Sequence, residues 1–254
     1  MLKNIEEGGV NALVNGRHWL HERFVLQSTA SVVTRRDHAV PSTQRGLEEP
    51  LFVDTETGEW SGGSPFNSKT DNVTLSLGLK GTWILGNHTL KCGVHYSHLD
   101  TDFRVRNDVI WRYADDEYYR LMNMEDGTVG SREPSAFLQD SWRLWDRLRL
   151  NAGVRWDGQY IINSEGDIGA RFLDQWQPRV GFTYQLGERG VHQFFGSFGR
   201  FYQNVSLAAP ALYMISNGDY RVVYYDHDPR VDPTVTDTLT WDDLQSLEET
   251  EGLE

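Results

Sequence analysis

Residues 72–97 read NVTLSLGLKGTWILGNHTLKCGVHYS, and their apolar side chains recur at every second position. Leu75 and Leu77 fall on one face of this stretch, while Ser76 falls on the other. A period of two residues is typical of a β-strand with two unlike faces. The alternation stops at Gly86-Asn87, a turn-forming pair, and resumes after it. The stretch therefore predicts a hairpin with two long arms.

Three more hairpins of this kind are predicted along the chain. They join residues 12–20 to 24–33, residues 136–144 to 148–162, and residues 180–186 to 191–202. The four tight turns lie near residues 21, 86, 146 and 188. Much longer connections, at residues 34–70, 102–131 and 163–175, alternate with these turns. The sequence therefore predicts about eight strands, with short turns at one end and long loops at the other.

The length of the arms distinguishes a membrane barrel from a soluble β-sandwich. The longer arms, of about 12 to 15 residues, exceed the usual ~5 to 6 of globular sheets. At ~3.3 Å per residue they reach ~40 Å, enough to cross a hydrocarbon layer of ~30 Å when tilted. Short turns opposite long loops are typical of outer-membrane barrels. We therefore expect an all-β, antiparallel, transmembrane β-barrel segment.

Tryptophans near the tight turns agree with this interpretation. Trp19, Trp83, Trp142 and Trp145 all lie within about four residues of a turn. Barrels carry girdles of aromatic side chains at the level of the lipid headgroups. Ordinary core tryptophans would explain the same positions equally well.

Composition excludes several classes of protein. The 254 residues carry 24 Lys and Arg against 37 Asp and Glu, a net charge of −13, which opposes binding to nucleic acid. The single cysteine, Cys92, excludes an internal disulfide framework and a cysteine-rich zinc site. The amino terminus shows no export signal, and no apolar run is long enough for a transmembrane helix. A mean hydropathy of −0.54 does not exclude a β-barrel, whose strands are apolar on alternate residues only.

Four segments carry a family resemblance. Residues 136–157 (AFLQDSWRLWDRLRLNAGVRWD) resemble the "F-x-Q-D-x-W … L-x-L-N-x-G-x-R-x-D" hairpin of TonB-dependent outer-membrane receptors. Residues 86–94 resemble the family's "G-x-H-x-h-K-h-G" strand, in which h is any apolar residue. Residues 177–184 resemble its "x-P-R-h-G-h-x-Y" strand, and residues 196–202 its "G-s-y-G-R-f-Y" arm. In order and spacing, the set is most similar to the Oar-like receptors and covers roughly half of the chain.

The resemblance implies a barrel of about 22 strands closed around a separate plug domain. Such a receptor imports a scarce, bulky nutrient with energy relayed from the inner membrane. The resemblance therefore also implies three partners, namely outer-membrane lipid, a plug domain and an energy-coupling protein. No plug or coupling segment is recognisable before Ala12. We therefore expect a fragment in which residues 1–203 are a partial barrel. Residues 204–254 are expected to form an acidic extracellular loop or tail, truncated before the next strand.

The polar faces of the predicted strands supply one group of candidate site residues. Alternation places six charged side chains on the face that would line the lumen: Lys80, Lys91, Arg149, Arg155, Asp157 and Arg179. Two interpretations stay open for them. They form a mutually paired, hydrated wall, or they serve to dock a plug or to pass an anionic solute.

A second group lies in one of the long connections. Asp115, Asp116 and Glu117 precede Tyr118 and Tyr119, and this mixture of acids and aromatic rings could select a ligand in an exposed loop. It could equally be a loop without a binding role.

No metal, cofactor or catalytic site is predicted. His95 and His98 point to opposite faces of one strand, so they cannot share an ion. The acids of residues 226–232 lack the mid-loop glycine and the terminal acid of a calcium-binding hand. No nucleophile, base and acid occur in an arrangement that favours catalysis, so we do not expect an enzyme.

Two alternatives to a receptor barrel remain at this point. A small outer-membrane porin or anchor would need the first arm to close on the last, and residues 12–20 alternate poorly. A soluble, carbohydrate-binding β-sandwich would need polar outer faces throughout. For the transported solute, the sequence leaves a siderophore, an oligosaccharide and a peptide open.

Overall fold

A computed structural model gives the architecture of the chain and describes residues 3–187, 191–208, 210, 214 and 219–239. The helical elements named below are α1 (Gln44–Glu48) and a 3₁₀ turn at Ala114–Asp116. The strands are β1 (Lys3–Gly8), β2 (Asn11–His21), β3 (Phe24–Pro41), β4 (Leu51–Asp54), β5 (Trp60–Gly62), β6 (Phe66–Leu85), β7 (His88–Arg112), β8 (Tyr118–Trp145), β9 (Leu148–Ile162), β10 (Ile168–Leu186), β11 (His192–Gly199), β12 (Asp219–Tyr225) and β13 (Asp237–Leu239).

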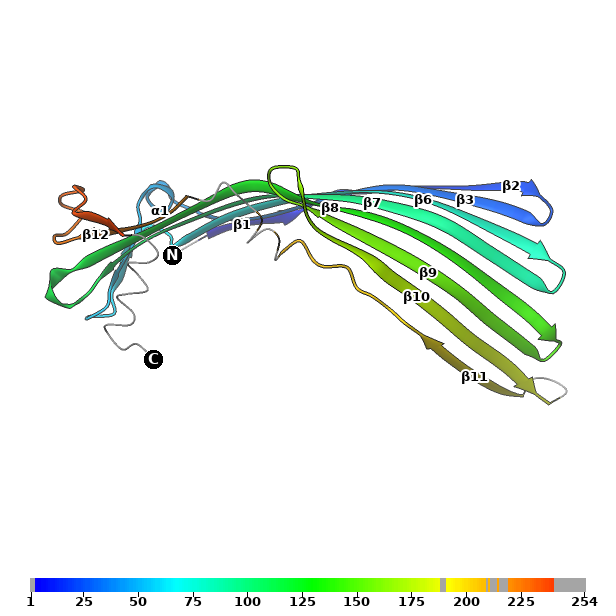
Figure 1. Ribbon diagram of the computed structural model, residues 1–254. Helices are drawn as coiled ribbons and strands as arrows, with labels where there is room; N and C mark the ends of the chain where they lie inside the picture. The colour runs from blue at the N-terminus through cyan, green and yellow to red at the C-terminus, as the bar shows by residue number, and fades with distance from the viewer. Residues whose placement is uncertain (1–2, 188–190, 209, 211–213, 215–218, 240–254) are drawn as a thin grey trace.

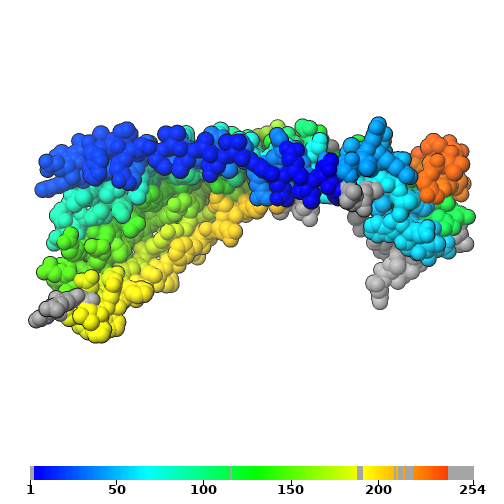
Figure 2. Space-filling model, turned by 180° about the vertical axis from the view of Figure 1, so that it is seen from behind, coloured from blue at the N-terminus to red at the C-terminus, as the bar shows by residue number. Residues whose placement is uncertain are grey.

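Within the described residues, these strands form one thirteen-stranded sheet. Its long strands follow the order β3-β6-β7-β8-β9-β10-β11, with neighbours antiparallel and β2 paired to β3 at the edge. The sheet is a single curved layer that arches from one end to the other (Figures 1 and 2). No pairing between the edge strands β2 and β11 occurs in the described part of the chain. The expected all-β antiparallel barrel segment is confirmed, as an open sheet.

The eight long arms are present, and three of the four tight turns lie where they were predicted. Gly86 adopts φ +60°, a conformation that glycine tolerates best, and so reverses the chain between β6 and β7. The turn expected near residue 188 lies outside the described residues. We call the end of the sheet that carries these turns the turn end and the opposite end the loop end.

Alternation gives the sheet an apolar face over its turn-end half. Leu77 lies opposite Ala30 on one side and Tyr96 on the other, and Val154 lies between Leu138 and Pro178. Many of these side chains are largely exposed in the single layer: Leu75, Leu77, Leu79, Val94, Leu138, Val180, Phe182, Phe194 and Phe198. An apolar surface of this extent needs a cover, which lipid provides in a membrane barrel.

The turn end of the apolar face carries aromatic side chains. The ring of Trp83 packs on Phe24 at 4.7 Å, and Trp142 stacks on His88 at 5.2 Å. The ring nitrogen Nδ1 of His88 lies 2.6 Å from a carboxylate oxygen of Asp140. The segments of β7 and β8 that carry the family resemblance are therefore in contact on neighbouring strands. Trp19 departs from the expected girdle, because its register opposite Val25 places it on the other face.

The loop end differs from the expected long connections. β7 and β8 continue as a paired ladder as far as Arg112 and Tyr118, so residues 102–131 are mostly strand. Val109 and Ile110 are 8% and 2% exposed on opposite faces, and burial on both faces removes the period of two. Strands β4 and β12 extend the sheet beside them by pairing with β7 and β8.

The region expected to be an acidic tail also contains regular structure. β12 pairs with β8 over Asp219–Tyr225, and β13 pairs with β12. Val223 and Tyr225 join Phe52, Ile110 and Tyr118 in a buried cluster at the loop end. Residues 240–254 lie outside the described residues. The division of the chain at residue 203 and the extracellular position of the second part stay predictions.

Among the described residues, no helix has the length and apolar character of a membrane span.

Candidate functional site

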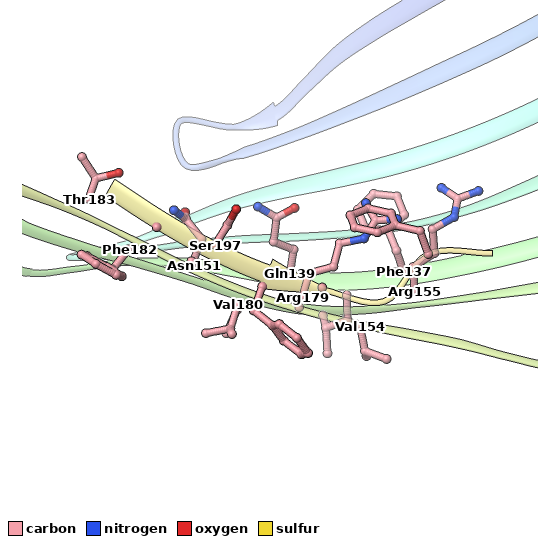
Figure 3. Close-up of a pocket in the computed structure, with 18 of the residues that line it drawn as sticks. Phe137, Gln139, Asn151, Val154, Arg155, Arg179, Val180, Phe182, Thr183 and Ser197 are labelled. Atoms are coloured by element: carbon pink, nitrogen blue, oxygen red, sulfur yellow. The ribbon is translucent and has the colours of Figure 1, made fainter. Parts of the chain in front are cut away.

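The six predicted lumen residues share one face of the sheet, which we call the polar face. Lys80 and Lys91 lie diagonally across the β6–β7 ladder, and Arg155 lies opposite Phe137 on β8 and Gln177 on β10. Arg149, Asp157 and Arg179 follow by alternation on β9 and β10. Figure 3 shows the division of the layer, with Arg155, Arg179 and Gln139 on one side and Val154, Val180 and Phe182 on the other. That this face lines a lumen stays a prediction.

Three of the six form one hydrogen-bonded network. Arg155 Nε lies 2.9 Å from both carboxylate oxygens of Asp157, and its Nη2 lies 3.3 Å from Ser135 Oγ. Gln177 donates its side-chain amide to Asp157 and accepts at 2.9 Å from Arg179. A carboxylate held by a guanidinium and an amide is fixed in orientation, so this part of the wall is rigid.

The other three cations are not paired in this way. Within the part of the chain that the structure describes, no ion pair is formed by Lys80, Lys91 or Arg149. Lys80 and Lys91 are half-buried and Arg149 is exposed. The polar face therefore carries uncompensated positive charge although the whole chain has a net charge of −13. Such a surface attracts anionic groups, whether of a protein or of a solute.

A hollow of about 990 Å³ lies over β8 to β11 beside this network. Its polar-face lining includes Phe137, Gln139, Asn151, Arg179 and Ser197 (Figure 3). Phe137 covers Gly93 of β7 so closely that a Cβ there would lie 2.5 Å from its ring. An aromatic ring lying over a cross-strand glycine fills the gap that glycine leaves in a sheet.

The segment after β11 returns along the polar face, and we call residues 200–207 the strap. Gln159 is fully buried and pairs with Val205 like a second peptide unit: its amide nitrogen donates to the Val205 carbonyl and its oxygen accepts from the Val205 N–H, each at 2.8 Å. Arg179 lies 4.5 Å above the ring of Phe201. Leu207 packs with Val129 and Ile161. The strap is thus attached to the polar face of the sheet at three points.

The predicted loop residues separate in the structure. Asp115 and Asp116 lie in the 3₁₀ turn, and the Asp116 carboxylate bonds to Arg112. Tyr118 is 5% exposed and belongs to the buried cluster, so its ring is not open to a ligand. Tyr119 lies on the opposite face, where its hydroxyl is 3.5 Å from Glu117.

Arg112 holds this tip to the rest of the loop end. Its guanidinium hydrogen-bonds Asp116 at 3.1 Å and Asp54 at 2.8 Å, and these bonds raise its pKa above the ordinary value. In turn, a turn-forming bond from Thr57 and the bond from Arg112 lower the pKa of Asp54. The tip therefore has a defined position, although it is exposed.

The described residues contain no group of three histidine, cysteine or acidic side chains able to hold a metal ion. His95 and His98 lie on opposite faces of β7, as alternation predicts. The acids of residues 226–232 bond to neighbours within their own loop: Asp226 to His227 and Thr236, and Asp228 to Arg230.

Several polar partners were missed from the sequence. Ser135 and Gln177 complete the Arg155 network, and Gln159 anchors the strap, but serine and glutamine on a polar strand face carry no local signal of a special role. Gln159 and Val205 are 46 positions apart. Alternation did place Gln177 beside Arg179 on one face, which is the signal that could have indicated their contact.

Comparison with known proteins gives a family match over most of the chain. The family model described as "TonB dependent receptor-like, beta-barrel" matches residues 15–240. A curated relative, the TonB-dependent transporter Oar of Myxococcus xanthus, is 28% identical over 201 residues, which cover 66% of this chain. The match spans about a fifth of that protein (19%). No solved structure matches the chain. The names of the family and the relative are those of receptors and transporters and not of enzymes.

Proposed function

This chain belongs to the TonB-dependent receptor-like β-barrel family, and from this premise we propose that it forms part of the outer-membrane barrel of a receptor that takes up a scarce, bulky solute. The two-faced sheet supports this function most directly. Apolar side chains are exposed on one face of the sheet, and some of the charged side chains on the other face are hydrogen-bonded to one another. This is the pattern of a wall with lipid on one side and water on the other.

The length of the strands supports the same proposal. On the apolar face, β6 is apolar from Val73 to Leu85, which at ~3.3 Å per residue extends ~40 Å. With a tilt of ~45°, this length spans the hydrocarbon layer. Beyond it, Arg36, Asp71 and Asp100 begin a zone of ion pairs on the same face.

A plug domain and an energy-coupling protein are the partners that we propose for the complete receptor. The basic polar face is a suitable surface for an acidic side of a plug, because Lys80, Lys91 and Arg149 have no ion-pair partner among the described residues. The strap lies on the same face and would contact whatever fills the lumen. A small closed porin would need its first and last arms to pair, and β2 and β11 do not pair in the described part of the chain.

The proposal is tested by locating the full-length protein and by following solute uptake. We expect it in the outer-membrane fraction, with faster gel migration before heating than after, as folded barrels show. Uptake of its solute should stop when the proton gradient of the inner membrane is dissipated, while binding at the surface should persist. A protein that fractionates as soluble, without heat-dependent migration, would contradict the proposal.

A further inference from the structure

A row of aromatic side chains crosses the loop end of the sheet. The strand order there is β5-β4-β7-β8-β12-β13, and the register brings one residue from each strand into line. These residues are Trp60, Val53, Trp111, Tyr119, Tyr224 and Asp237. At ~4.8 Å between strands, the row is ~24 Å wide. We call Trp60, Trp111, Tyr113, Tyr119 and Tyr224 the aromatic platform.

The platform lies on the continuation of the polar face. β7 pairs with β8 from His88 to Arg112 without a register shift, so alternate residues keep their side throughout. Lys91 on the polar wall and Trp111 on the platform therefore share a face of β7. In a barrel, a surface in this position faces the mouth above the lumen.

The three tyrosine rings of the platform pack against one another, and the platform remains accessible. Tyr119 contacts Tyr113 edge-to-face at 5.5 Å and Tyr224 at 5.3 Å. Trp60 is 69% exposed and Tyr113 is 45% exposed, whereas Trp111, Tyr119 and Tyr224 are half-buried. Rings held in this way lose little further freedom on binding, which favours recognition.

The charged side chains on the platform face are acidic, and one of them, Asp226, is paired with the adjacent His227. Glu117, Glu125, Asp226 and Asp237 lie on this face, and no arginine or lysine lies with them among the described residues of these strands. Burial, and then the nearby charges of Glu117 and Asp226, raise the pKa of the Tyr224 hydroxyl above its ordinary value.

The opposite face of the same strands is ion-paired. Asp108 binds Arg106 and Arg120, and Arg112 binds Asp54 and Asp116. Among the described residues of these strands, it is therefore the platform face that combines exposed aromatic rings with carboxylates that have no arginine or lysine partner.

We propose that the aromatic platform, Trp60, Trp111, Tyr113, Tyr119 and Tyr224, with Glu117 and Asp237 at its margin, binds a peptide through arginine or lysine side chains. This inference rests on the proposed receptor function, because it assigns the ligand class of the surface above the lumen. Guanidinium and ammonium groups are attracted to the faces of tryptophan and tyrosine rings, and carboxylates at the edge add charge-assisted hydrogen bonds. The row is wide enough for several residues of an extended peptide.

Binding is measured on the full-length protein in outer-membrane vesicles, with a fluorescent peptide of alternating glycine and arginine as the probe. The same peptide with glutamate in place of arginine and a neutral oligosaccharide are the competitors. We expect the arginine peptide alone to bind, and its affinity to fall as salt rises. Glu117→Gln with Asp237→Asn should weaken binding about tenfold, and Trp60→Ala about fivefold.

Asp126→Asn is the matched control, because Asp126 is an exposed acid on the opposite face, paired with Arg104. It should change the affinity by less than about twofold. Heat-dependent gel migration of each variant reports the barrel separately from the ligand, so failure of the receptor proposal would show there. Equal binding of both peptides, displacement by the oligosaccharide, or full affinity in the Glu117→Gln, Asp237→Asn protein with an intact barrel would overturn the platform proposal.

Discussion

Replacing Leu79 with arginine would place a charge in the middle of the apolar face. Leu79 lies on β6 midway between Val73 and Leu85 and is 51% exposed. The distance to either end is ~20 Å along the strand, or ~14 Å in depth at a tilt of ~45°, so the residue lies near the midplane of a ~30 Å layer. Arginine on the lipid face at that depth costs about 2–4 kcal/mol. The folding equilibrium constant should therefore fall about 30- to 900-fold.

The matched variant is Ser76→Arg on the same strand. Ser76 lies on the polar face and shares a 2.9 Å hydroxyl contact with Ser97. Its replacement loses this one hydrogen bond, at about 1 kcal/mol, and leaves the new charge in water. Denaturant titration of both variants, folded in lipid vesicles, gives the two free energies of unfolding. Equal costs, or a larger cost at Ser76, would refute the assignment of the lipid face.

Three other predictions follow from local contacts. Gln159→Ala should cost about 1–3 kcal/mol and speed hydrogen exchange in residues 200–207, because the Val205 N–H and carbonyl lose their partners; unchanged exchange at Val205 would contradict the strap attachment. Gly93→Ala should cost about 1–3 kcal/mol, since its Cβ would lie 2.5 Å from Phe137 and 2.8 Å from the Leu79 carbonyl, whereas Gly8→Ala, with open space around it, should be mild in the same denaturant titration. The loop of residues 226–236 should be most protected from hydrogen exchange in mildly acidic solution, and protection that is flat across pH after correction for intrinsic exchange would exclude the His227 contact. The bond to Asp226 raises the pKa of His227 above 6.5, so the stability from this bond is full below pH 6.5 and is lost as the pH rises through the raised pKa. His227 and Thr236 lower the pKa of Asp226 below 3.8, so the stability from Asp226 is lost as the pH falls through that lowered pKa.

The turn-end half of the sheet was predictable because it has two unlike environments. One face of β6 and β7 is apolar and the other polar, so the period of two survives in the sequence and the turn at Gly86 is legible. The same alternation places Arg155 and Arg179 on one face. It cannot indicate which of the charged side chains pair, since this depends on rotamers and on Gln177 between them.

The loop-end half was not predictable for the opposite physical reason. Val109 and Ile110, and likewise Val222 and Val223, are buried on both faces, so consecutive apolar residues replace the alternation. The pairing of β4 with β7 and the contact between Gln159 and Val205 join segments far apart in the chain. Only the folded sheet brings them together, and the aromatic platform is formed in the same way.

The single cysteine of the chain can show whether the apolar face meets lipid and the polar face meets water. Cys92 is exposed and lies on the apolar face opposite Gly81 and Leu138. Gln139, next to Leu138, lies on the polar face opposite Lys91. The measurement is the rate of labelling by a small, water-soluble thiol reagent in intact outer-membrane vesicles. We compare the natural protein with Gln139→Cys in a Cys92→Ser background. Cys92 should resist labelling until the membrane is dissolved and the protein unfolded, while the cysteine at position 139 should react in the intact vesicle. Rapid labelling of Cys92 together with protection at position 139 would contradict the assignment of the two faces.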